Sequence, residues 1–361
     1  MNYREIRRVS RAVMAGGVGI GGEHPIAIQS MTNTNPHDAA ATAEQILRLQ
    51  AAGCDVVRIT VPDLEAAEAI GAIRRAGVKI PVVADIHFDY RVALRCAELG
   101  FDKIRINPGN IGDEDRVRQV ANACRERHIP IRIGVNSGSL EKHLLAKYGA
   151  PTAQALCDSA LYHSALLEKF NFEDIVISIK ASDVPAMVAA NRLLARSCPH
   201  PIHLGVTEAG GGEEGMIKSA MGIGALLLDG IGDTLRVSLT EDPVHEIAAA
   251  RRILDGLRIE GQSGMNIVSC PTCGRTQIDL IALCEQFKRA VRAEGLDRLP
   301  IKVALMGCVV NGPGEAREAD VGIAGGRGEG LLFRNGQIVK KVPESELIPR
   351  LLAEIRAMDK Q

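Results

Sequence analysis

The sequence predicts an α/β protein with two domains, a (β/α)₈ TIM barrel followed by a small α+β domain. Three observations lead to this prediction. The 361 residues exceed what one hydrophobic core usually organises. Short β-branched runs alternate with helical segments from residue 26 to about residue 240, and this alternation stops after Leu257. We therefore expect the barrel over residues 1–258, a linker over 259–266 and the second domain over 267–361.

Eight segments carry the strand pattern, and eight strand–helix units in this length favour a closed barrel over an open doubly wound sheet. The predicted strands are Ile26–Met31, Val56–Val61, Pro81–Ile86, Lys103–Asn107, Ile131–Val135, Ile175–Ile179, Ile202–Val206 and Thr234–Leu239. Helical periodicity lies between them, at Ala39–Ala52, Leu64–Ala76, Asp113–Arg127, Val184–Ser197, Met216–Leu228 and Pro243–Leu257. No Gly-rich dinucleotide-binding motif follows the first strand, which weakens the open-sheet alternative further.

The second domain mixes strands and helices without the regular βα alternation. A strand leads into the first cysteines of this domain, a hairpin turns at Asn335–Gly336, and the remaining predicted elements are a helix at Ile278–Ala293, strands at Ile301–Leu305 and Asp320–Ile323, and a helix at Ser345–Met358. This pattern predicts a small α+β module.

The composition excludes several classes of protein. A formal net charge of −1 and ten aromatic residues, with no Trp, argue against nucleic acid as a partner. With 46% hydrophobic and 24% charged residues, the chain has the composition of a soluble globular protein, and we expect no membrane association. Nine cysteines, an odd number, in a chain with no signal-peptide pattern indicate a reducing, cytoplasmic location.

Three cysteines of the second domain have the spacing of metal ligands. Cys270 and Cys273 form a C-x-x-C pair, and Cys308 lies in a Gly-rich loop. A structural zinc site needs four Cys or His ligands, but no second C-x-x-C and no His follow Cys273. The sequence therefore predicts a three-thiolate metal site whose fourth ligand is open.

Glu315, seven residues after Cys308, is one candidate for that fourth ligand. Its alternative interpretation is a helix N-cap or a surface carboxylate. An oxygen ligand would be more labile than a thiolate, so a substrate oxygen could replace it. Under that interpretation the metal centre would be catalytic.

The barrel strands carry polar residues two positions apart, which directs both side chains to one face. Five of these residues are cationic, namely Arg58, Arg105, Arg132, Lys180 and Arg236, and they exceed the two nearby acids, Asp85 and Glu208. Unpaired cations in a barrel favour an anionic ligand at the carboxyl ends of the strands. Because Arg matches phosphate oxygens in a bidentate way, we expect a phosphate or diphosphate. Asn136 and Thr207 offer neutral donors, and Asp85, His87 and Glu208 are candidates for proton transfer.

Several ordered motifs resemble one family over nearly the whole chain. They are Gln29-Ser-Met-Thr-Asn33, Ala84-Asp-Ile-His-Phe88, Arg105-Ile-Asn-Pro-Gly109, Gly205-Val-Thr-Glu-Ala209, Ser269-Cys-Pro-Thr-Cys-Gly274 and Gly307-Cys-Val-Val-Asn-Gly-Pro-Gly-Glu315. The chain resembles the 4-hydroxy-3-methylbut-2-enyl diphosphate synthases of the non-mevalonate isoprenoid pathway, in their compact bacterial two-domain form. The resemblance implies two-electron reductive ring opening and dehydroxylation of 2-C-methyl-D-erythritol 2,4-cyclodiphosphate.

The resemblance also implies the ligands and partners. A [4Fe-4S] cluster would be held by Cys270, Cys273, Cys308 and Glu315, and flavodoxin or ferredoxin would supply electrons to a homodimer. Asp85, His87 and Glu208 match positions near the reacting carbons, and Glu315 would take part in catalysis. The resemblance implies that the diphosphate is bound by Arg58, Arg132, Asn136, Lys180, Thr207, Arg236 and Ser238, and we add Arg105 to this set.

The sequence leaves three alternatives to this interpretation. A pterin-type barrel transferase fits Gly134-Val-Asn-Ser-Gly138 but not the three cysteines. A zinc-stabilised anion-binding module would be colourless and would contain no acid-labile sulfide. A radical S-adenosylmethionine enzyme would need its three cysteines within a few residues, which this sequence does not have.

Overall fold

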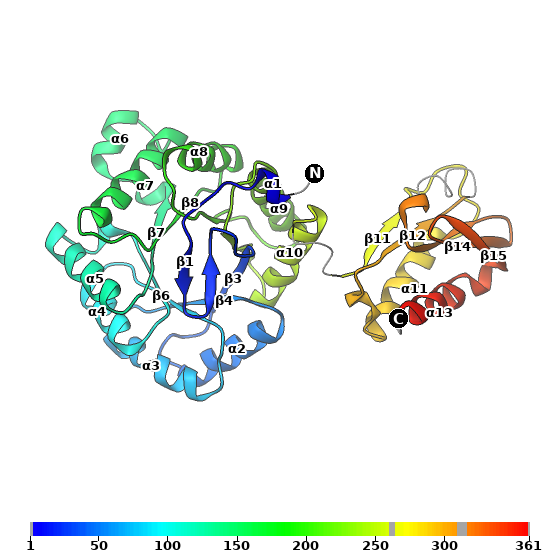
Figure 1. Cartoon of the computed structure of the whole chain (residues 1–361), viewed down its shortest axis with the longest axis horizontal. Coiled ribbons are helices and arrows are strands. Elements are labelled where there is room, and N and C mark those ends of the chain that lie inside the picture. The colour runs from blue at the N-terminus through cyan, green and yellow to red at the C-terminus, as the bar shows by residue number, and fades with distance from the viewer. Residues whose placement is uncertain (1–2, 260–263, 309–315, 360–361) are drawn as a thin grey trace. The chain divides into compact units, whose positions relative to one another are not determined.

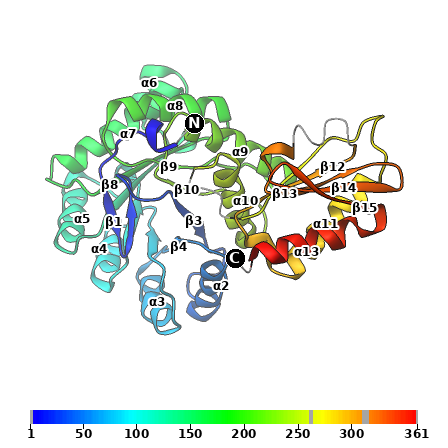
Figure 2. The same ribbon diagram turned by 45° about the vertical axis from the view of Figure 1, so that its right-hand side comes forward.

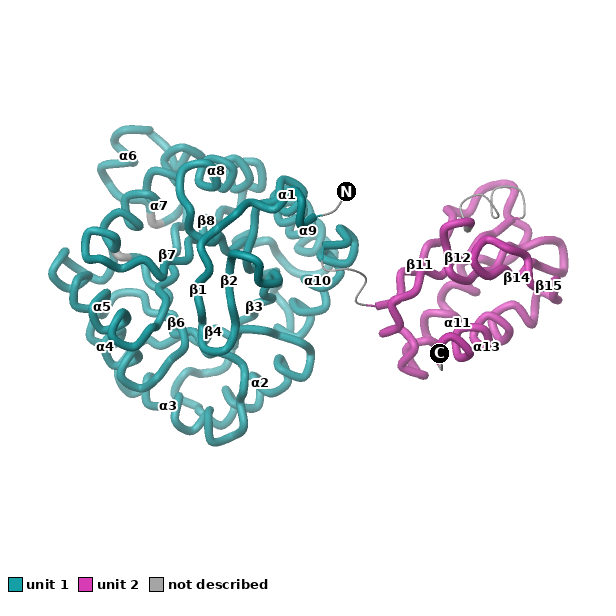
Figure 3. The backbone as a smooth tube through the Cα atoms, viewed as in Figure 1, with its two compact units in different colours: residues 1–259 teal, residues 260–361 magenta. Residues whose placement is uncertain are grey.

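The computed structural model describes residues 3–259, 264–308 and 316–359. The chain divides into two compact units, residues 1–259 and 260–361 (Figure 3), and each is described by itself. The linker predicted over 259–266 includes residues 260–263, which lie outside the described ranges, so the linker stays a prediction.

Eight parallel strands form the first unit's main sheet, in the order β8-β7-β6-β5-β4-β3-β10-β9. A parallel bridge between Ile177 and Ile202 joins the two ends of this order. The sheet therefore closes, and the predicted (β/α)₈ TIM barrel is confirmed. Its strands are β3 (Ala27–Met31), β4 (Val56–Thr60), β5 (Val82–Asp85), β6 (Lys103–Ile106), β7 (Ile131–Asn136), β8 (Ile175–Lys180), β9 (His203–Leu204) and β10 (Thr234–Leu235).

Helices surround this barrel on its outer side (Figures 1 and 2). Their apolar faces pack on the outward side chains of the strands, for example Ile70 and Ile73 of α3 and Leu194 of α8. The helices are α1 (Tyr3–Ile6), α2 (Ala39–Ala51), α3 (Leu64–Arg75), α4 (Tyr90–Leu99), α5 (Glu114–Glu126), α6 (Lys142–Tyr148), α7 (Ala153–Glu168), α8 (Val184–Ser197), α9 (Gly212–Leu228) and α10 (Pro243–Gly256).

Aspartates fix where several of these helices begin. The carboxylates of Asp38, Asp63, Asp89, Asp113, Asp183 and Asp242 each accept a hydrogen bond from a backbone N–H in the first turn of the helix that follows. Such caps satisfy N–H groups that lack a partner within the helix. The loops that lead into these six helices therefore end at defined residues.

A short hairpin, β1 (Val13–Ala15) and β2 (Val18–Ile20), covers the amino-terminal end of the barrel. Val13, Ala15 and Ile20 pack on Val176, the first inward residue of β8. The sequence analysis did not predict this hairpin, because three-residue strands are too short to show a period-two pattern. The hairpin fills one end of the barrel with apolar side chains.

The second unit is a mixed sheet with two helices on one face. The strand order is β11-β12-β13-β14-β15, parallel from β11 to β13 and antiparallel from β13 to β15. The predicted α+β character is confirmed. The elements are β11 (Asn266–Ser269), α11 (Leu280–Ala293), β12 (Lys302–Met306), β13 (Val321–Gly325), β14 (Glu329–Arg334), β15 (Gln337–Pro343) and α13 (Leu347–Asp359).

Alternation along β12 divides the core of this unit into two layers. Val303 and Leu305 join the cluster formed with the helices α11 and α13, whereas Ala304 and Met306 join a smaller cluster with Phe333. The predicted turn at Asn335–Gly336 connects β14 and β15, and both residues have positive φ, 48° and 74°. In the described ranges, no helix combines the length and the apolar character needed to span a membrane.

Candidate active site

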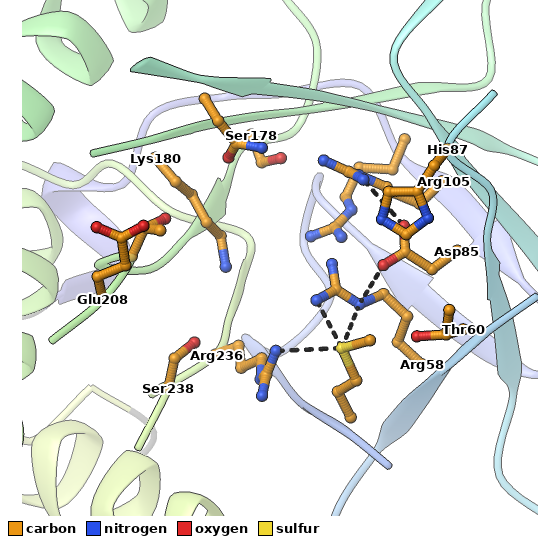
Figure 4. A pocket seen from close by; sticks show the side chains of 14 residues that line it. Arg58, Thr60, Asp85, His87, Arg105, Ser178, Lys180, Glu208, Arg236 and Ser238 are labelled. Atoms are coloured by element: carbon orange, nitrogen blue, oxygen red, sulfur yellow. Dashed lines mark hydrogen bonds and ion pairs between the residues drawn. The ribbon is translucent and has the colours of Figure 1, made fainter. Parts of the chain in front are cut away.

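A cavity of about 350 Å³ opens at the carboxyl ends of the barrel strands (Figure 4). All eight predicted substrate-binding residues line it, together with the predicted proton-transfer residues Asp85, His87 and Glu208. The structure thus brings these side chains into one pocket. The full lining is Met31, Arg58, Thr60, Asp85, His87, Arg105, Arg132, Asn136, Ser178, Lys180, Thr207, Glu208, Arg236 and Ser238.

Two glycines leave the space in which pocket cations lie. A Cβ atom at Gly134 of β7 would lie 2.4 Å from Nε of Arg105, and one at Gly205, just after β9, would lie 2.6 Å from Nζ of Lys180. Both distances are far below van der Waals contact. Because these two inward positions have no side chain, the long side chains of Arg105 and Lys180 can occupy the space beside them.

Asp85 is the acid between two arginines of the pocket. Its carboxylate oxygens lie 3.0 Å from Nη1 of Arg105 and 3.4 Å from Nε of Arg58. Burial by itself raises the pKa of this carboxyl, but the guanidinium groups of Arg58, Arg105 and Arg132 outweigh burial and lower the pKa to about 2. Asp85 is therefore an anion near neutral pH, and in this state it can accept a proton but not donate one.

Arg236 is held from behind by a buried carboxylate. Glu246 of α10, which is 1% exposed, accepts hydrogen bonds from Nε and Nη2 of Arg236 at 3.0 and 2.9 Å. On the pocket side, Nη1 of Arg236 lies 3.4 Å from Sδ of Met31, which also accepts from Arg58 at 2.8 and 3.2 Å. Met31 thus lies between two cations of the pocket wall.

Arg132 and Lys180 make no ion pair within the described residues. Arg132 is fully buried, and its Nε and Nη1 atoms have no hydrogen-bond partner there. Burial, reinforced by the neighbouring cations, lowers the pKa of both Arg132 and Lys180 well below their ordinary values. An anion in the pocket would reverse this cost, so these two residues carry the positive charge that Asp85 does not balance.

The candidate proton-transfer residues at the rim are exposed. His87 follows β5, and Glu208 follows Thr207, whose N–H donates to the carbonyl oxygen of Ala181 at 3.2 Å. Glu208 has a φ of 55°, the left-handed region that non-glycine residues seldom adopt. The chain turns sharply there, and Glu208 lines the pocket from its edge.

The barrel interior below the pocket is polar. Gln29, Lys103 and His203 are at most 1% exposed, and the Nζ of Lys103 and Nε2 of His203 have no hydrogen-bond partner within the described residues. Burial, followed by the charge of Arg132, lowers the pKa of Lys103 and His203 well below the ordinary range. Burial and the nearby cation therefore disfavour the charged forms of both side chains below the pocket.

In the second unit, two of the predicted metal-binding cysteines lie at one sheet edge. Cys270 follows β11 and Cys308 follows β12, and these parallel neighbours pair in register at Ser269 and Leu305. The N–H of Gly307 donates to Sγ of Cys270 at 3.3 Å, and its carbonyl accepts from the N–H of Gln277 at 3.1 Å. The C-x-x-C loop and the Cys308 loop are therefore joined by hydrogen bonds.

The donor set of this edge fits a thiolate-ligated metal centre. Cys273 is exposed, and hydrogen bonds from the backbone and then the side chain of Arg275 lower the pKa of its thiol. Cys270 and Cys308 are half-buried. By contrast, burial raises the pKa of Cys54 and Cys124 in the barrel to about 12, so these remain thiols.

The complete ligand set stays a prediction. Glu315, the predicted fourth ligand and catalytic residue, lies outside the described residues. Within the described ranges, no three His, Cys, Asp or Glu side chains are arranged as a metal site. What the structure brings together is the pair of loops that carry Cys270, Cys273 and Cys308.

Glu246 is a site residue that the sequence analysis missed when it counted only Asp85 and Glu208 as nearby acids. The sequence pattern that could have indicated Glu246 is an acidic residue on the apolar face of a predicted helix, because Glu246 lies on the same face as the buried Ala250 and Ile253. Met31 gave no such signal, since a methionine at the end of a strand is common in a core.

The fold and the pocket define a class of protein: a βα-barrel with a cationic pocket for an anionic ligand, joined to a small unit with thiols at a sheet edge. Two family models match the chain, the GcpE TIM-barrel domain over residues 10–251 and the GcpE protein C-terminal domain over residues 266–357. The chain belongs to the GcpE family.

Curated relatives match nearly the whole chain. A protein of Geobacter sulfurreducens is 58% identical over 96% of this chain and 97% of its own length, and one of Fusobacterium nucleatum is 56% identical over 96% of each. Both are named 4-hydroxy-3-methylbut-2-en-1-yl diphosphate synthase (flavodoxin). Among solved structures, dihydropteroate synthase of Thermus thermophilus matches 66% of this chain and 97% of its own at 13% identity, with a TM-score of 0.49.

Proposed function

We propose that this chain is an oxidoreductase that converts 2-C-methyl-D-erythritol 2,4-cyclodiphosphate to 4-hydroxy-3-methylbut-2-enyl diphosphate in isoprenoid biosynthesis. The observation that carries the proposal is the pocket in which Arg58, Arg105, Arg132, Lys180 and Arg236 converge. Its cations exceed its acids, as a diphosphate requires. The names of the curated relatives support the same reaction.

The side chains of the inner part of the pocket bind the diphosphate. Arg132 and Lys180 offer unpaired charge, the arginines held by Asp85 and Glu246 offer oriented donors, and neutral hydrogen bonds come from Asn136, Thr207 and Ser238. The rim residues His87 and Glu208 are placed to hold or move protons at the reacting end of the substrate. The anionic Asp85 orients Arg58 and Arg105.

The reaction takes up two electrons and two protons, opens the cyclic diphosphate at a C–O bond, and releases a hydroxyl group as water. Cys270, Cys273 and Cys308, with Glu315, would hold a [4Fe-4S] cluster, which supplies the electrons when bound. The names of the relatives include flavodoxin, which we propose as the electron donor, with ferredoxin as the alternative. A homodimer located in the cytoplasm, without nucleic acid or membrane partners, completes the proposal.

The test is anaerobic purification of the full chain, followed by iron and sulfide analysis and by turnover of the cyclic diphosphate with reduced flavodoxin. We expect about four iron and four sulfide per chain, and formation of the linear diphosphate. Colourless protein with stoichiometric zinc would instead support the zinc-stabilised anion-binding module. Turnover of a pterin substrate without reductant would support the transferase.

A further inference from the structure

We propose that Glu246 is a positioning residue that orients Arg236 for the diphosphate. This inference rests on the proposed function and extends it to a residue that does not line the pocket. Glu246 acts from behind, through the guanidinium group, and does not contact the substrate.

The geometry of the pair leaves one edge of the guanidinium group available. A guanidinium has a side edge, formed by Nε and Nη2, and an end edge, formed by Nη1 and Nη2. Glu246 takes the side edge, with its two oxygens at 3.0 and 2.9 Å. The end edge is left toward the pocket, where Nη1 lies 3.4 Å from Sδ of Met31 (Figure 4). Two parallel N–H groups on one edge match two phosphate oxygens.

Glu246 is itself fixed by hydrogen bonds from two segments of the barrel, β3 and the residues that follow β10. Its Oε2 accepts from Nε of Arg236 and, at 2.7 Å, from the hydroxyl of Ser30 on β3. Its Oε1 accepts from Nη2 of Arg236 and, at 3.2 Å, from the backbone N–H of Leu239. With both oxygens doubly occupied and the side chain 1% exposed, this carboxylate has one orientation. It transmits that orientation to Arg236.

Glu246 could instead act only by neutralising the charge of Arg236. This role predicts the opposite change in anion affinity when Glu246 is removed, so binding measurements distinguish the two roles. If Glu246 only neutralised charge, its removal would leave Arg236 unpaired and the pocket more positive, and anions would bind more tightly. If Glu246 positions Arg236, its removal lets a long, flexible side chain leave its orientation, and anions bind more weakly.

The experiment measures binding of inorganic pyrophosphate to the full chain by calorimetry, and KM and kcat for the cyclic diphosphate. In Glu246→Gln, which keeps the shape of the side chain, we expect pyrophosphate affinity to fall and KM to rise by about tenfold or more. kcat should change less. Glu98→Gln removes one exposed charge of the Arg95 pair on α4 and is the matched control, with no change expected.

A double-mutant cycle tests whether Glu246 acts through Arg236. In the Arg236→Ala background, Glu246→Gln should have no further effect on pyrophosphate affinity. Tighter binding by Glu246→Gln, unchanged binding in a variant with wild-type thermal stability, or an equal loss in both backgrounds would each overturn the proposal. Because pyrophosphate binding requires no turnover, a wild-type chain that binds pyrophosphate but does not convert the cyclic diphosphate would reject the proposed function alone.

Discussion

Lys180 reaches into the pocket through space that Gly205 leaves open: a Cβ atom on residue 205 would lie 2.6 Å from the Nζ of this lysine and 2.8 Å from the carbonyl oxygen of Arg236. The second of these atoms belongs to the backbone and cannot move aside cheaply. A small side chain at position 205 would therefore disturb both the lysine and the strand end that carries Arg236.

We expect Gly205→Ala to weaken pyrophosphate binding by about tenfold or more, because it displaces a cation from the site. Binding is measured by calorimetry, and folding by circular dichroism. Gly71→Ala in α3 is the matched control, since its nearest neighbour would be Nη1 of Arg75 at 3.5 Å, an ordinary contact. Equal pyrophosphate affinity in both variants would contradict this use of Gly205.

Binding of an anion should be coupled to proton uptake at Lys180. Burial, followed by the charges of Arg132 and Arg58, lowers the pKa of Lys180 well below its ordinary value of 10.5. A bound diphosphate favours the charged lysine and raises this pKa. Between the two pKa values the complex holds a proton that the free protein lacks, so affinity falls as pH rises through this window.

The uptake is measured by calorimetry in buffers of different ionisation enthalpy. Wild-type protein should take up more protons per bound pyrophosphate than Lys180→Met, because only the wild type has the lysine that gains a proton. The ionisation of pyrophosphate itself contributes equally to both proteins and cancels in the comparison. The same proton uptake in the two proteins would show that the lysine keeps one charge state.

Asp85→Asn should destabilise the barrel by about 3–5 kcal/mol, since it leaves Arg58 and Arg105 buried without their acid. The pKa of Asp85 is lowered to about 2, below the value of about 3.9 of an unfolded chain. Its contribution is therefore complete above about pH 4 and is lost as pH falls through about 2. Urea unfolding across this range measures the contribution and its loss.

Pyrophosphate should restore much of the stability that Asp85→Asn loses, because an anion again balances the arginines. Asp115→Asn, which breaks an exposed ion pair with Arg118, is the control and should unfold close to wild type. A wild-type unfolding curve for Asp85→Asn would contradict the role of Asp85 as the balancing charge.

Gly307→Ala should impair metal binding by the second unit. A Cβ atom at position 307 would lie 2.7 Å from Cγ2 of Thr276, in the loop that also carries Cys273. We therefore expect a lower iron and sulfide content after anaerobic purification. Gly274→Ala, which adds a methyl group with no neighbour within 4 Å among the described residues, should keep the wild-type content. Equal loss in both variants would point to a general sensitivity of the loop instead.

Cys308→Ser should lose the cluster, whereas Cys284→Ser should keep it, because Cys284 lies in the core between α11 and the sheet. Iron, acid-labile sulfide and visible absorbance distinguish the two variants. Glu315→Ala should retain a damaged cluster and lose turnover. Turnover of this variant at the wild-type rate would exclude Glu315 from catalysis.

The barrel and most of its pocket could be predicted because both follow from local pattern. Arg58 and Thr60, or Arg132 and Asn136, lie an even number of residues apart on one strand, so their side chains share the inward face. The predicted strands agree with β3 to β8 within one residue at each end. β9 and β10 contain two residues each and end at Leu204 and Leu235, two and four residues before the predicted ends.

The remaining features depend on tertiary contacts that a local pattern does not contain. Glu246 comes from a helix, and its role arises only because α10 packs against β3 and reaches the residues that follow β10. Lys103 on β6 and His203 on β9 lie on strands that are not neighbours, and the charge of Lys103 acts on His203 only because the barrel closes. The β1–β2 hairpin is too short to have a period, and only its packing on Val176 gives it a place in the fold.

That hairpin has a kinetic consequence. Since apolar side chains seal the amino-terminal end of the barrel, a diphosphate that enters the pocket must depart by the mouth through which it came. The next substrate molecule cannot enter until the previous product has left. Under the proposed function, the linear diphosphate should therefore inhibit competitively against the cyclic one, and its dissociation rate sets an upper limit on the number of turnovers per second.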